Sequence, residues 1–246
     1  HLVGTLGYAA GGTYQPAAAV DRNGTVADFN GDGLLDIAYY NDTAGLVLGL
    51  NNGGSFGASG FDMGIAAGTI ASGRYEFGDV DRDGDTDLVK LDVNAGTVSF
   101  LYNNGAGTFT PGGQTISLSY PARVEVADLN GDAYPDLVVV RNAGLGDQVY
   151  LGSASGSFTV AGALGSAGAK CIEVADLNGD GYNDIVIGNW GTQGQVWMND
   201  HTGHFTQTGT LSVWDMATGT TAQGATLDIE IRDFDGDGDK DIFFAN

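Results

Sequence analysis

Short acidic side chains recur at fixed positions in five nine-residue segments of this sequence. The segments begin at Asp28, Asp79, Asp128, Asp176 and Asp233, with Asp at positions 1, 5 and 9 and Asn or Asp at position 3. Position 6 is glycine in four of the five segments, which suits a tightly turning backbone. Hard divalent cations take oxygen ligands, and Ca²⁺ accepts six to eight of them from carboxylates, amides and backbone carbonyls. The pattern therefore predicts up to five Ca²⁺ sites.

We expect the ligands to be the side chains at positions 1, 3, 5 and 9 and the backbone carbonyl at position 7. The third segment has Ala133 in place of glycine, and alanine resists a left-handed backbone conformation, so this segment should bind Ca²⁺ most weakly. The candidate metal residues, including additional acids at position 7, are Asp28, Asn30, Asp32, Leu34, Asp36, Asp79, Asp81, Asp83, Asp85, Asp87, Asp128, Asn130, Asp132, Tyr134, Asp136, Asp176, Asn178, Asp180, Tyr182, Asp184, Asp233, Asp235, Asp237, Asp239 and Asp241.

The segments differ from EF-hand loops, although their first five positions match. An EF-hand needs a bidentate Glu at position 12 and a helix on each side. Here the runs before and after each segment are typical of strands, such as 124–127 before the third segment and 137–140 after it. Each segment should therefore join two strands. The residues at position 12, none of which can chelate Ca²⁺ by its side chain, are Tyr39, Lys90, Val139, Ile187 and Phe244.

The composition agrees with a metal-binding protein of the all-β class. The 246 residues carry a formal charge of −22, and nineteen of the 31 acidic residues lie in the five segments. Nine basic residues argue against nucleic acid and against an anionic membrane surface, and no apolar run is long enough to span a bilayer. The single cysteine, Cys171, excludes an internal disulfide and is expected to be a small buried hydrophobic residue.

A repeat of about fifty residues organises the chain. The first Asp residues of successive segments are 51, 49, 48 and 57 residues apart, a spacing that favours propeller blades. Each period also contains a hairpin turn rich in Asn, Gly or Ser and followed by Phe, at 51–56, 103–109, 152–158 and 199–205. The repeat unit is thus strand, acidic loop, strand, connection, strand, hairpin, strand. Four antiparallel strands make one propeller blade.

The two ends of the sequence complement each other within this repeat. Residues 5–14 align without gaps with residues 47–56, so the chain opens at the third strand of a blade, and residues 241–246 read as a second strand. We therefore predict a five-bladed β-propeller of four-stranded antiparallel blades. Strands from both termini would pair in one blade and close the ring, which leaves no exposed strand edge. Residues 1–246 would then form a single domain.

The combination of strand, DxDxDGxxD loop, apolar strand and NNGxGTF hairpin resembles the FG-GAP/VCBS repeat family, which includes the integrin α-subunit propellers. The resemblance covers essentially the whole chain. It implies that the acidic loops bind Ca²⁺ at the first strand-to-strand turn of each blade. The family more often builds seven blades, so five blades would be a departure. It includes adhesion receptors, lectins, polysaccharide-lyase-type enzymes and accessory domains, so the resemblance implies fold and metal but no particular ligand.

The first strand of each blade should line a central channel and carry a row of polar residues there. Three positions before the first Asp of each loop stand Thr25, Glu76, Glu125, Glu173 and Glu230, and two positions further back stand Asn23, Arg74, Arg123, Cys171 and Asp228. Strand alternation places both rows on one side. They could form a charged ring that binds a cation or a ligand, or Arg–Glu pairs that only neutralise each other.

Two connections between blades are longer than the others, at 57–73 and 206–227. Each contains an aromatic residue followed by Asp and Met, and added loop length is where functional residues tend to lie. We predict ligand contacts at Asp62, Trp214 and Asp215; the alternative is that these residues fill a gap between blades. His201 and His204 lie in one hairpin, where a zinc pair is a further alternative.

These features favour a secreted or cell-surface Ca²⁺-binding propeller, expected to be a monomer, that binds an extracellular glycan or an adhesive protein partner. Exposed loops of this kind suit the millimolar Ca²⁺ outside cells. No nucleic acid and no membrane insertion are expected. A polysaccharide lyase or hydrolase, or an accessory domain of one, is the enzymatic alternative. Since the sequence contains no Ser-His-Asp arrangement, GxSxG motif or phosphate-binding loop, we favour a binding module and assign no catalytic residue.

Overall fold

The computed structural model describes residues 25–41, 45–53, 56–57, 74–142, 145–165, 168–190, 192–211, 213–215, 220–222 and 228–245. The regular elements in these ranges are β-strands, which confirms the all-β prediction. Among the described residues no helix is long and apolar enough to cross a membrane. The chain divides into two compact units. The first contains residues 1–71 and 103–110, and the second contains residues 72–102 and 111–246.

The first unit contains a four-stranded antiparallel sheet in the order β1-β2-β3-β4. The first acidic loop joins β1 to β2, and the 51–56 hairpin joins β3 to β4, as the repeat predicts. The strands are β1 (Thr25–Ala27), β2 (Asp36–Asn41), β3 (Gly45–Asn51) and β4 (Phe56–Gly57).

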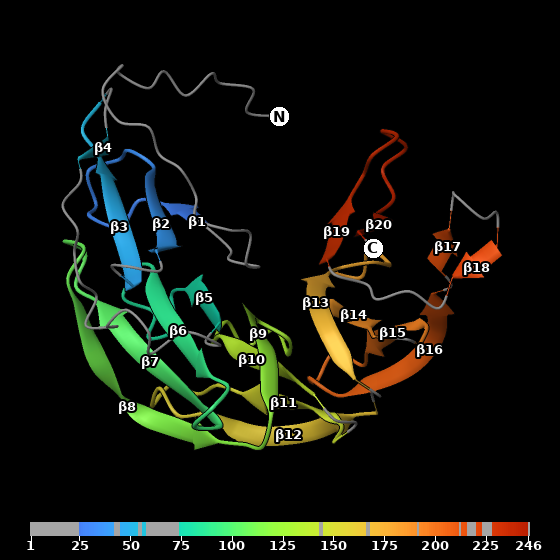
Figure 1. Ribbon diagram of the computed structural model, residues 1–246. Helices are drawn as coiled ribbons and strands as arrows, with labels where there is room; N and C mark the ends of the chain where they lie inside the picture. The colour runs from blue at the N-terminus through green and yellow to red at the C-terminus, as the bar shows by residue number, and fades with distance from the viewer. Residues whose placement is uncertain are drawn as a thin grey trace. The chain divides into compact units, whose positions relative to one another are not determined.

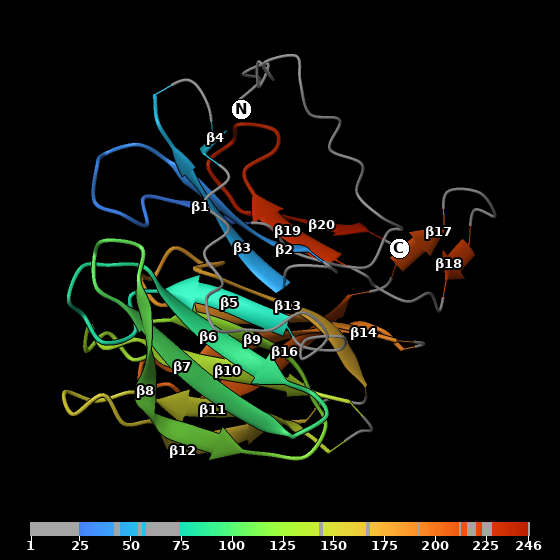
Figure 2. The ribbon, with the colours of Figure 1, turned by 60° about the vertical axis from the view of Figure 1, so that its left-hand side comes forward.

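Three further four-stranded antiparallel sheets follow the same order of strands (Figures 1 and 2). Each has an acidic loop between its first two strands and a hairpin between its last two. The second sheet comprises β5 (Arg74–Gly78), β6 (Asp87–Asp92), β7 (Thr97–Asn103) and β8 (Phe109–Ser117). The third comprises β9 (Pro121–Ala127), β10 (Asp136–Arg141), β11 (Asp147–Leu151) and β12 (Thr159–Leu164). The fourth comprises β13 (Ala169–Ala175), β14 (Asp184–Asn189), β15 (Gly194–Asn199) and β16 (Phe205–Leu211).

The last part of the chain contributes two pairs of strands. β17 (Val213–Asp215) pairs with β18 (Thr220–Ala222), and this pair lies within the long connection at 206–227. β19 (Asp228–Arg232) pairs with β20 (Asp241–Ala245) across the fifth acidic loop. Among the described residues this last sheet has two strands rather than four.

The first strands of successive sheets in the second unit lie side by side, in the order β5, β9, β13 and β19 (Figure 1). Consecutive sheets therefore pack through their faces. Because both faces of the third and fourth sheets are covered, the second strand of each reads as a continuous apolar run instead of an alternating one. This is why 137–140 and 185–187 are almost entirely Val, Leu and Ile.

Alternate residues of one strand contribute to the cores on its two sides. On β10, Leu137 and Val139 belong to the core shared with the second sheet, whereas Val138 and Val140 belong to the core shared with the fourth. Two stacked rings connect the second and third sheets, since Phe100 and Phe158 have centroids 4.9 Å apart with 11° between their planes. Cys171 is only 1% exposed and packs in the core with β19, which confirms it as a buried hydrophobic residue.

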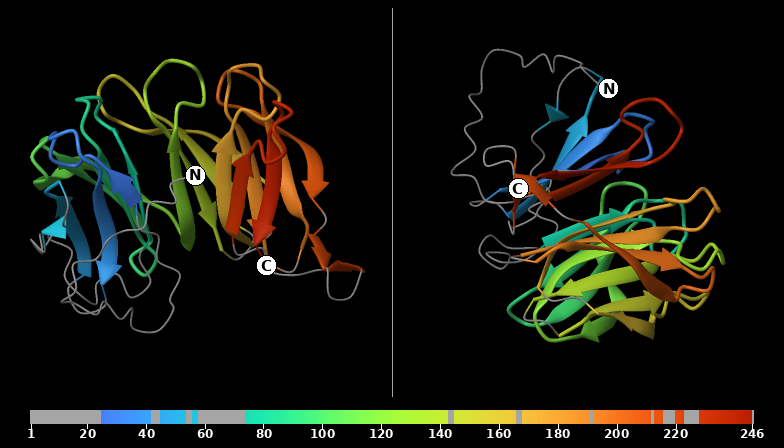
Figure 3. Two further views of the ribbon diagram at one scale, coloured as in Figure 1. Left: turned by 90° about the horizontal axis from the view of Figure 1, so that it is seen from above. Right: turned by 90° about the vertical axis from the view of Figure 1, so that its right-hand side faces the viewer.

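The order of strands separates the connections of the second unit into two ends (Figure 3). At the loop end lie the acidic loops and the hairpins that follow the third strands. At the crossover end lie the turns that follow the second strands, such as 93–96, and the connections from one sheet to the next, such as 118–120. The acidic loops therefore repeat along one end of the second unit, and the crossovers lie at the other.

Candidate metal centres and the inner acidic cluster

The Asp at position 9 joins three strands of its sheet in the first, third and fourth loops. Asp136 is fully buried, and its two carboxylate oxygens accept hydrogen bonds from the backbone N–H of Leu129 (2.8 Å) and of Gly152 (2.7 Å). The first N–H belongs to the start of the loop and the second follows the third strand. Asp36 and Asp184 make the same two bonds in their own sheets. A carboxylate predicted as a metal ligand thus also fixes the blade.

The Asp at position 1 folds the loop around its own carboxylate. Asp176 accepts from the backbone N–H groups of Gly179 (2.8 Å), Asp180 (3.2 Å) and Gly181 (2.9 Å). The other four first-position Asp residues likewise accept from the N–H at position 6. This shared pattern explains the spacing of the motif, because the turn that presents the acids is held by one of them.

The loop with alanine at position 6 has the same conformation as the others. Ala133 has φ of +65°, close to the left-handed values of its glycine counterparts, and its N–H donates to Asp128 at 2.9 Å. Left-handed geometry costs an L-residue roughly 1–2 kcal/mol. The sequence therefore correctly identified a backbone conflict at Ala133, but the loop closes in spite of it. The weaker affinity expected of this loop stays a prediction.

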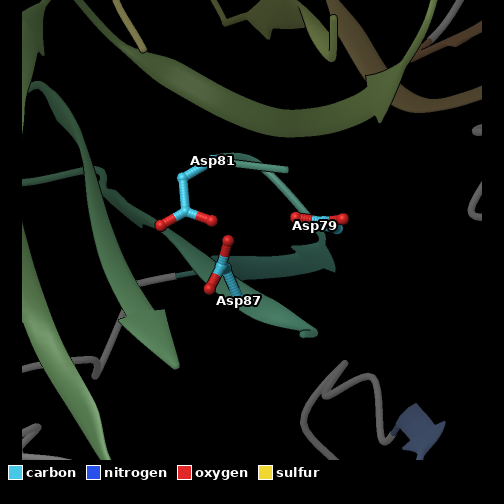
Figure 4. A group of neighbouring side chains, drawn as sticks. All are labelled: Asp79, Asp81 and Asp87. Carbon is cyan, nitrogen blue, oxygen red and sulfur yellow. The ribbon is translucent and has the colours of Figure 1, made fainter. Parts of the chain in front are cut away.

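The carboxylates of two loops converge enough to share one ion. In the second loop, Asp79, Asp81 and Asp87 each place one oxygen within 4.8 Å of the others, and Figure 4 shows their carboxylates turned toward a common centre. Asp233, Asp235 and Asp241 do the same in the fifth loop. Since Ca²⁺–oxygen distances are about 2.3–2.6 Å, oxygens separated by up to about 5 Å can bind the same ion. The donor set and its geometry therefore fit Ca²⁺.

Neighbouring loops of the second unit contact one another. The guanidinium carbon of Arg82, in the second loop, lies 4.6 Å from the ring centroid of Tyr134 in the third. Asn183, in the fourth loop, donates to the backbone carbonyl of Asp128 in the third at 3.1 Å. Arg82 has φ of +66° at a position where the other four loops have glycine. An arginine at this position strains the backbone, and the repeat does not require it.

A histidine that the sequence analysis considered only as half of a zinc pair reaches the fourth loop. His201 Nε2 lies 3.0 Å from Asp180 Oδ2, and its ring stacks on Tyr182 with centroids 4.3 Å apart. Its φ is +73°, and the same hairpin position in the second sheet is Gly105, with φ of +71°. A non-glycine residue at this repeat position was the available sequence signal. His204 is oriented by Thr202 instead, so the proposed zinc pair gains no support.

The inner strands bring a group of glutamates together. Glu76, Glu125 and Glu173 take the same place on β5, β9 and β13, which lie side by side. Burial raises the pKa of Glu125 well above its usual range, and the negative charges of Glu76 and Glu173 raise it further. Burial also raises the pKa of Glu173 to about 7, aided by Glu230. The predicted row of acids on the inner strands is thus a mutually repelling cluster.

The basic residues beside this cluster compensate it only in part. Arg123 lowers the pKa of Glu125, but its Nε donates to the backbone carbonyl of Lys170 at 2.9 Å. Arg232 forms an ion pair with Glu230, a pairing of residues two apart on one strand, but with a partner that the sequence analysis did not name. The predicted pairing of each Glu with an Arg on the same strand is therefore seen for Glu230 and Arg232. It does not describe Arg123, whose Nε donates to the Lys170 carbonyl.

The structure does not test the predicted ligand residues. Asp62 lies outside the described residues. Trp214 and Asp215 lie on β17, for which the backbone alone is described. Contact of these three residues with a ligand stays a prediction.

Comparison with known protein families identifies the repeat. The FG-GAP-like repeat matches residues 28–90, 79–139, 128–187 and 176–244. Each match begins at one acidic loop and ends in the strand that follows the next acidic loop. These stretches together span most of the sequence. The chain therefore belongs to the FG-GAP-like repeat family, as the loops and hairpins indicated.

The solved structures that align with this chain include a lectin of the same fold and a matrix protein. A lectin of Agrocybe aegerita that recognises non-reducing terminal N-acetylglucosamine aligns with a TM-score of 0.54 and 23% identity, over 90% of this chain and 56% of the lectin. The V. cholerae biofilm matrix protein Bap1 aligns with a TM-score of 0.48 and 16% identity, over 91% of this chain and 34% of Bap1. This chain thus spans about half of the lectin and a third of Bap1. No curated protein sequence matches it.

Replacing Glu125 with Gln should stabilise the protein at neutral and alkaline pH. Because the folded-state pKa of Glu125 is raised, the fold favours the neutral carboxyl, and this stability is lost as the pH rises through the folded-state pKa. Glu125→Gln should therefore raise the melting temperature at pH 8 and change it little at pH 4.5. Asp200→Asn is the matched control, since hydrogen bonds from Thr202 lower the pKa of that exposed carboxyl. An equal gain in both variants, or no gain at pH 8, would contradict the repulsive cluster.

Proposed function

We propose that this chain is a single Ca²⁺-loaded, five-bladed β-propeller that acts outside the cell as a glycan-binding module. The observation that carries the metal assignment is the convergence of three carboxylates in each of the second and fifth loops. The other loops share the same backbone hydrogen bonds, with Asn in place of one acid. All five loops therefore qualify as Ca²⁺ sites, and their exposure suits the Ca²⁺ concentration outside cells.

Within each proposed centre, the residues of the chain have separate tasks. The position-1 carboxylate orients the turn through backbone N–H groups, and the position-9 carboxylate anchors it to the second and third strands. Both retain lone pairs for a cation, because each carboxylate oxygen can accept more than one interaction. A bound Ca²⁺ ion supplies the positive charge that lets these acids remain ionised next to one another.

The fifth repeat supports the proposal that the ring is closed. β19 and β20 supply the first two strands of a blade, and residues 5–14 align with 47–56, which form parts of β3 and β4 and the hairpin between them. We assign residues from the N-terminal segment as the third and fourth strands of that blade. Closure covers the outer edge of β20 and produces one domain.

Glycan binding is assigned by analogy with the Agrocybe aegerita lectin, which has the same fold and recognises N-acetylglucosamine. A strongly acidic surface with nine basic residues disfavours polyanionic ligands. An adhesive protein partner is the second candidate, because the outer strands leave apolar residues such as Val160 60% exposed.

Removal of residues 1–18 should expose an edge of the fifth blade and cause aggregation. Size-exclusion chromatography with light scattering should show the full chain as a monomer and the truncated chain as oligomers or insoluble material. A truncated chain that remains a stable monomer with the melting temperature of the full chain would contradict closure by the N-terminal segment.

Binding to a glycan array should require Ca²⁺. The full chain should bind a defined subset of glycans in 2 mM Ca²⁺, a concentration chosen at the order of extracellular levels, and lose that binding in excess EDTA because the loops hold the fold. The readout is fluorescence of the labelled protein on the array, with restored Ca²⁺ as the control. Absence of any glycan binding in Ca²⁺, together with capture of a purified matrix protein, would favour the adhesive alternative.

A further inference from the structure

An open depression lies at the crossover end of the second unit, far along the strands from the acidic loops. It lies between the β6–β7 turn at 93–96 and the connection from β8 to β9, and has a volume of about 510 Å³. This is within the range of small-molecule sites, roughly 300–1,000 Å³. Exposed side chains of Asn94, Ser117, Ser119 and Tyr120 contribute to its lining. No hydrogen bond among the described residues occupies the side chains of Asn94, Ser117 or Ser119.

Hydrogen bonds hold the backbone around this depression in place. Leu118 N–H donates to the carbonyl of Gly96 at 2.9 Å, which ties the turn to the crossover. Within the turn, the Asp92 carboxylate accepts from the N–H groups of Asn94 (3.0 Å) and Ala95 (2.8 Å). The free side-chain amide and hydroxyl groups therefore project from a preformed frame, which reduces the ordering cost of binding.

Tyr120 occupies a backbone position that favours glycine. Its φ is +54°, its side chain is 62% exposed, and the equivalent residue of the next repeat is Gly168, with φ of +92°. Both residues lie eight positions before the first Asp of their loops, and the carbonyl of each accepts from a residue at the end of the second strand. Since the exposed ring contributes little to the core, packing does not explain this strain. Strain of this kind collects at ligand sites.

A second exposed aromatic residue is linked to Tyr120 through two polar residues. Asn142 N–H donates to the Tyr120 carbonyl at 2.8 Å, and the Asn142 side chain accepts from Lys170 Nζ at 3.0 Å. Lys170 Nζ lies 5.7 Å from the ring centroid of Trp190, which is 60% exposed. Trp190 and Asn142 stand at the same repeat position, where the second sheet has Val93, so the repeat itself does not require tryptophan.

From this arrangement we infer that the depression and the adjoining residues Asn142, Lys170 and Trp190 form a single binding surface for a neutral saccharide. The inference rests on the proposed glycan-binding function and names its site. Aromatic rings pack against the apolar faces of sugar rings, while amide, hydroxyl and ammonium groups bond the sugar hydroxyls. The formal charge of −22 disfavours acidic sugars. Because the tyrosine and tryptophan are not repeated at the equivalent positions of the described neighbouring sheets, one ligand per chain is expected.

The test uses the full chain with Ca²⁺ on an array of neutral hexose, N-acetylhexosamine and uronic-acid glycans, followed by calorimetry with the strongest neutral glycan. Tyr120→Gly should weaken binding about tenfold or more while the melting temperature stays the same or rises, because glycine relieves the left-handed strain. Trp190→Ala should weaken binding by a similar factor with little loss of stability. Phe56→Ala, an exposed aromatic residue in the other unit, is the control and should bind as wild type does.

The outcomes separate the site from the function. Neutral glycans bound equally by wild type, Tyr120→Gly and Trp190→Ala would overturn the site and leave the proposed glycan binding intact. Binding of uronic-acid glycans alone would overturn the neutral class of ligand. A fall in the melting temperature that accounts for the lost affinity would assign Tyr120 a structural role and remove it from the site. No binding to any glycan would overturn both proposals.

Discussion

The hydrogen bonds from backbone N–H groups to the loop carboxylates are the interaction on which the rest of the structure depends. In each loop the position-1 Asp shapes the turn, and the position-9 Asp connects the turn to its strands. In the third sheet, this buried acid has a pKa raised to about 6, chiefly by burial. Keeping such acids charged and adjacent is unfavourable without a counter-ion, so the carboxylates that fix the geometry of the sheet are also those whose charge the proposed Ca²⁺ would compensate.

Repetition of this unit explains how the sheets stack. The second strands of the third and fourth sheets are apolar on both faces, so each of these sheets packs against two neighbours through the same kind of surface. Departures from the repeat are therefore informative. Arg82, Tyr120 and His201 all adopt positive φ where an equivalent position has glycine, and each side chain projects toward a loop, a depression or another ring. Strain at these positions is not needed to build the repeat.

Much of the fold could be predicted from the sequence because two sequence signals, the acidic loop and the hairpin turn, recur in every described four-stranded sheet. The Asp spacing located each loop, and the hairpins rich in Asn, Gly or Ser located the third and fourth strands, as β9 to β12 confirm. The double role of Asp136 was not predictable, since its backbone partner Gly152 is sixteen residues away. The surface around Tyr120 and Trp190 was missed for a similar reason. Its residues come from separate repeats, and only folding places Lys170 between Asn142 and the tryptophan ring.

Thermal unfolding with and without Ca²⁺ tests most directly whether the loops hold the fold. A ligand at a hundred times its dissociation constant stabilises by about 2.7 kcal/mol per site, and a chain of this size gains roughly 2–4 °C per kcal/mol. Removal of Ca²⁺ from five loops by excess EDTA should therefore lower the melting temperature by tens of degrees, and added Ca²⁺ should restore it. A change of only a degree or two would contradict the dependence of this fold on its metal loops.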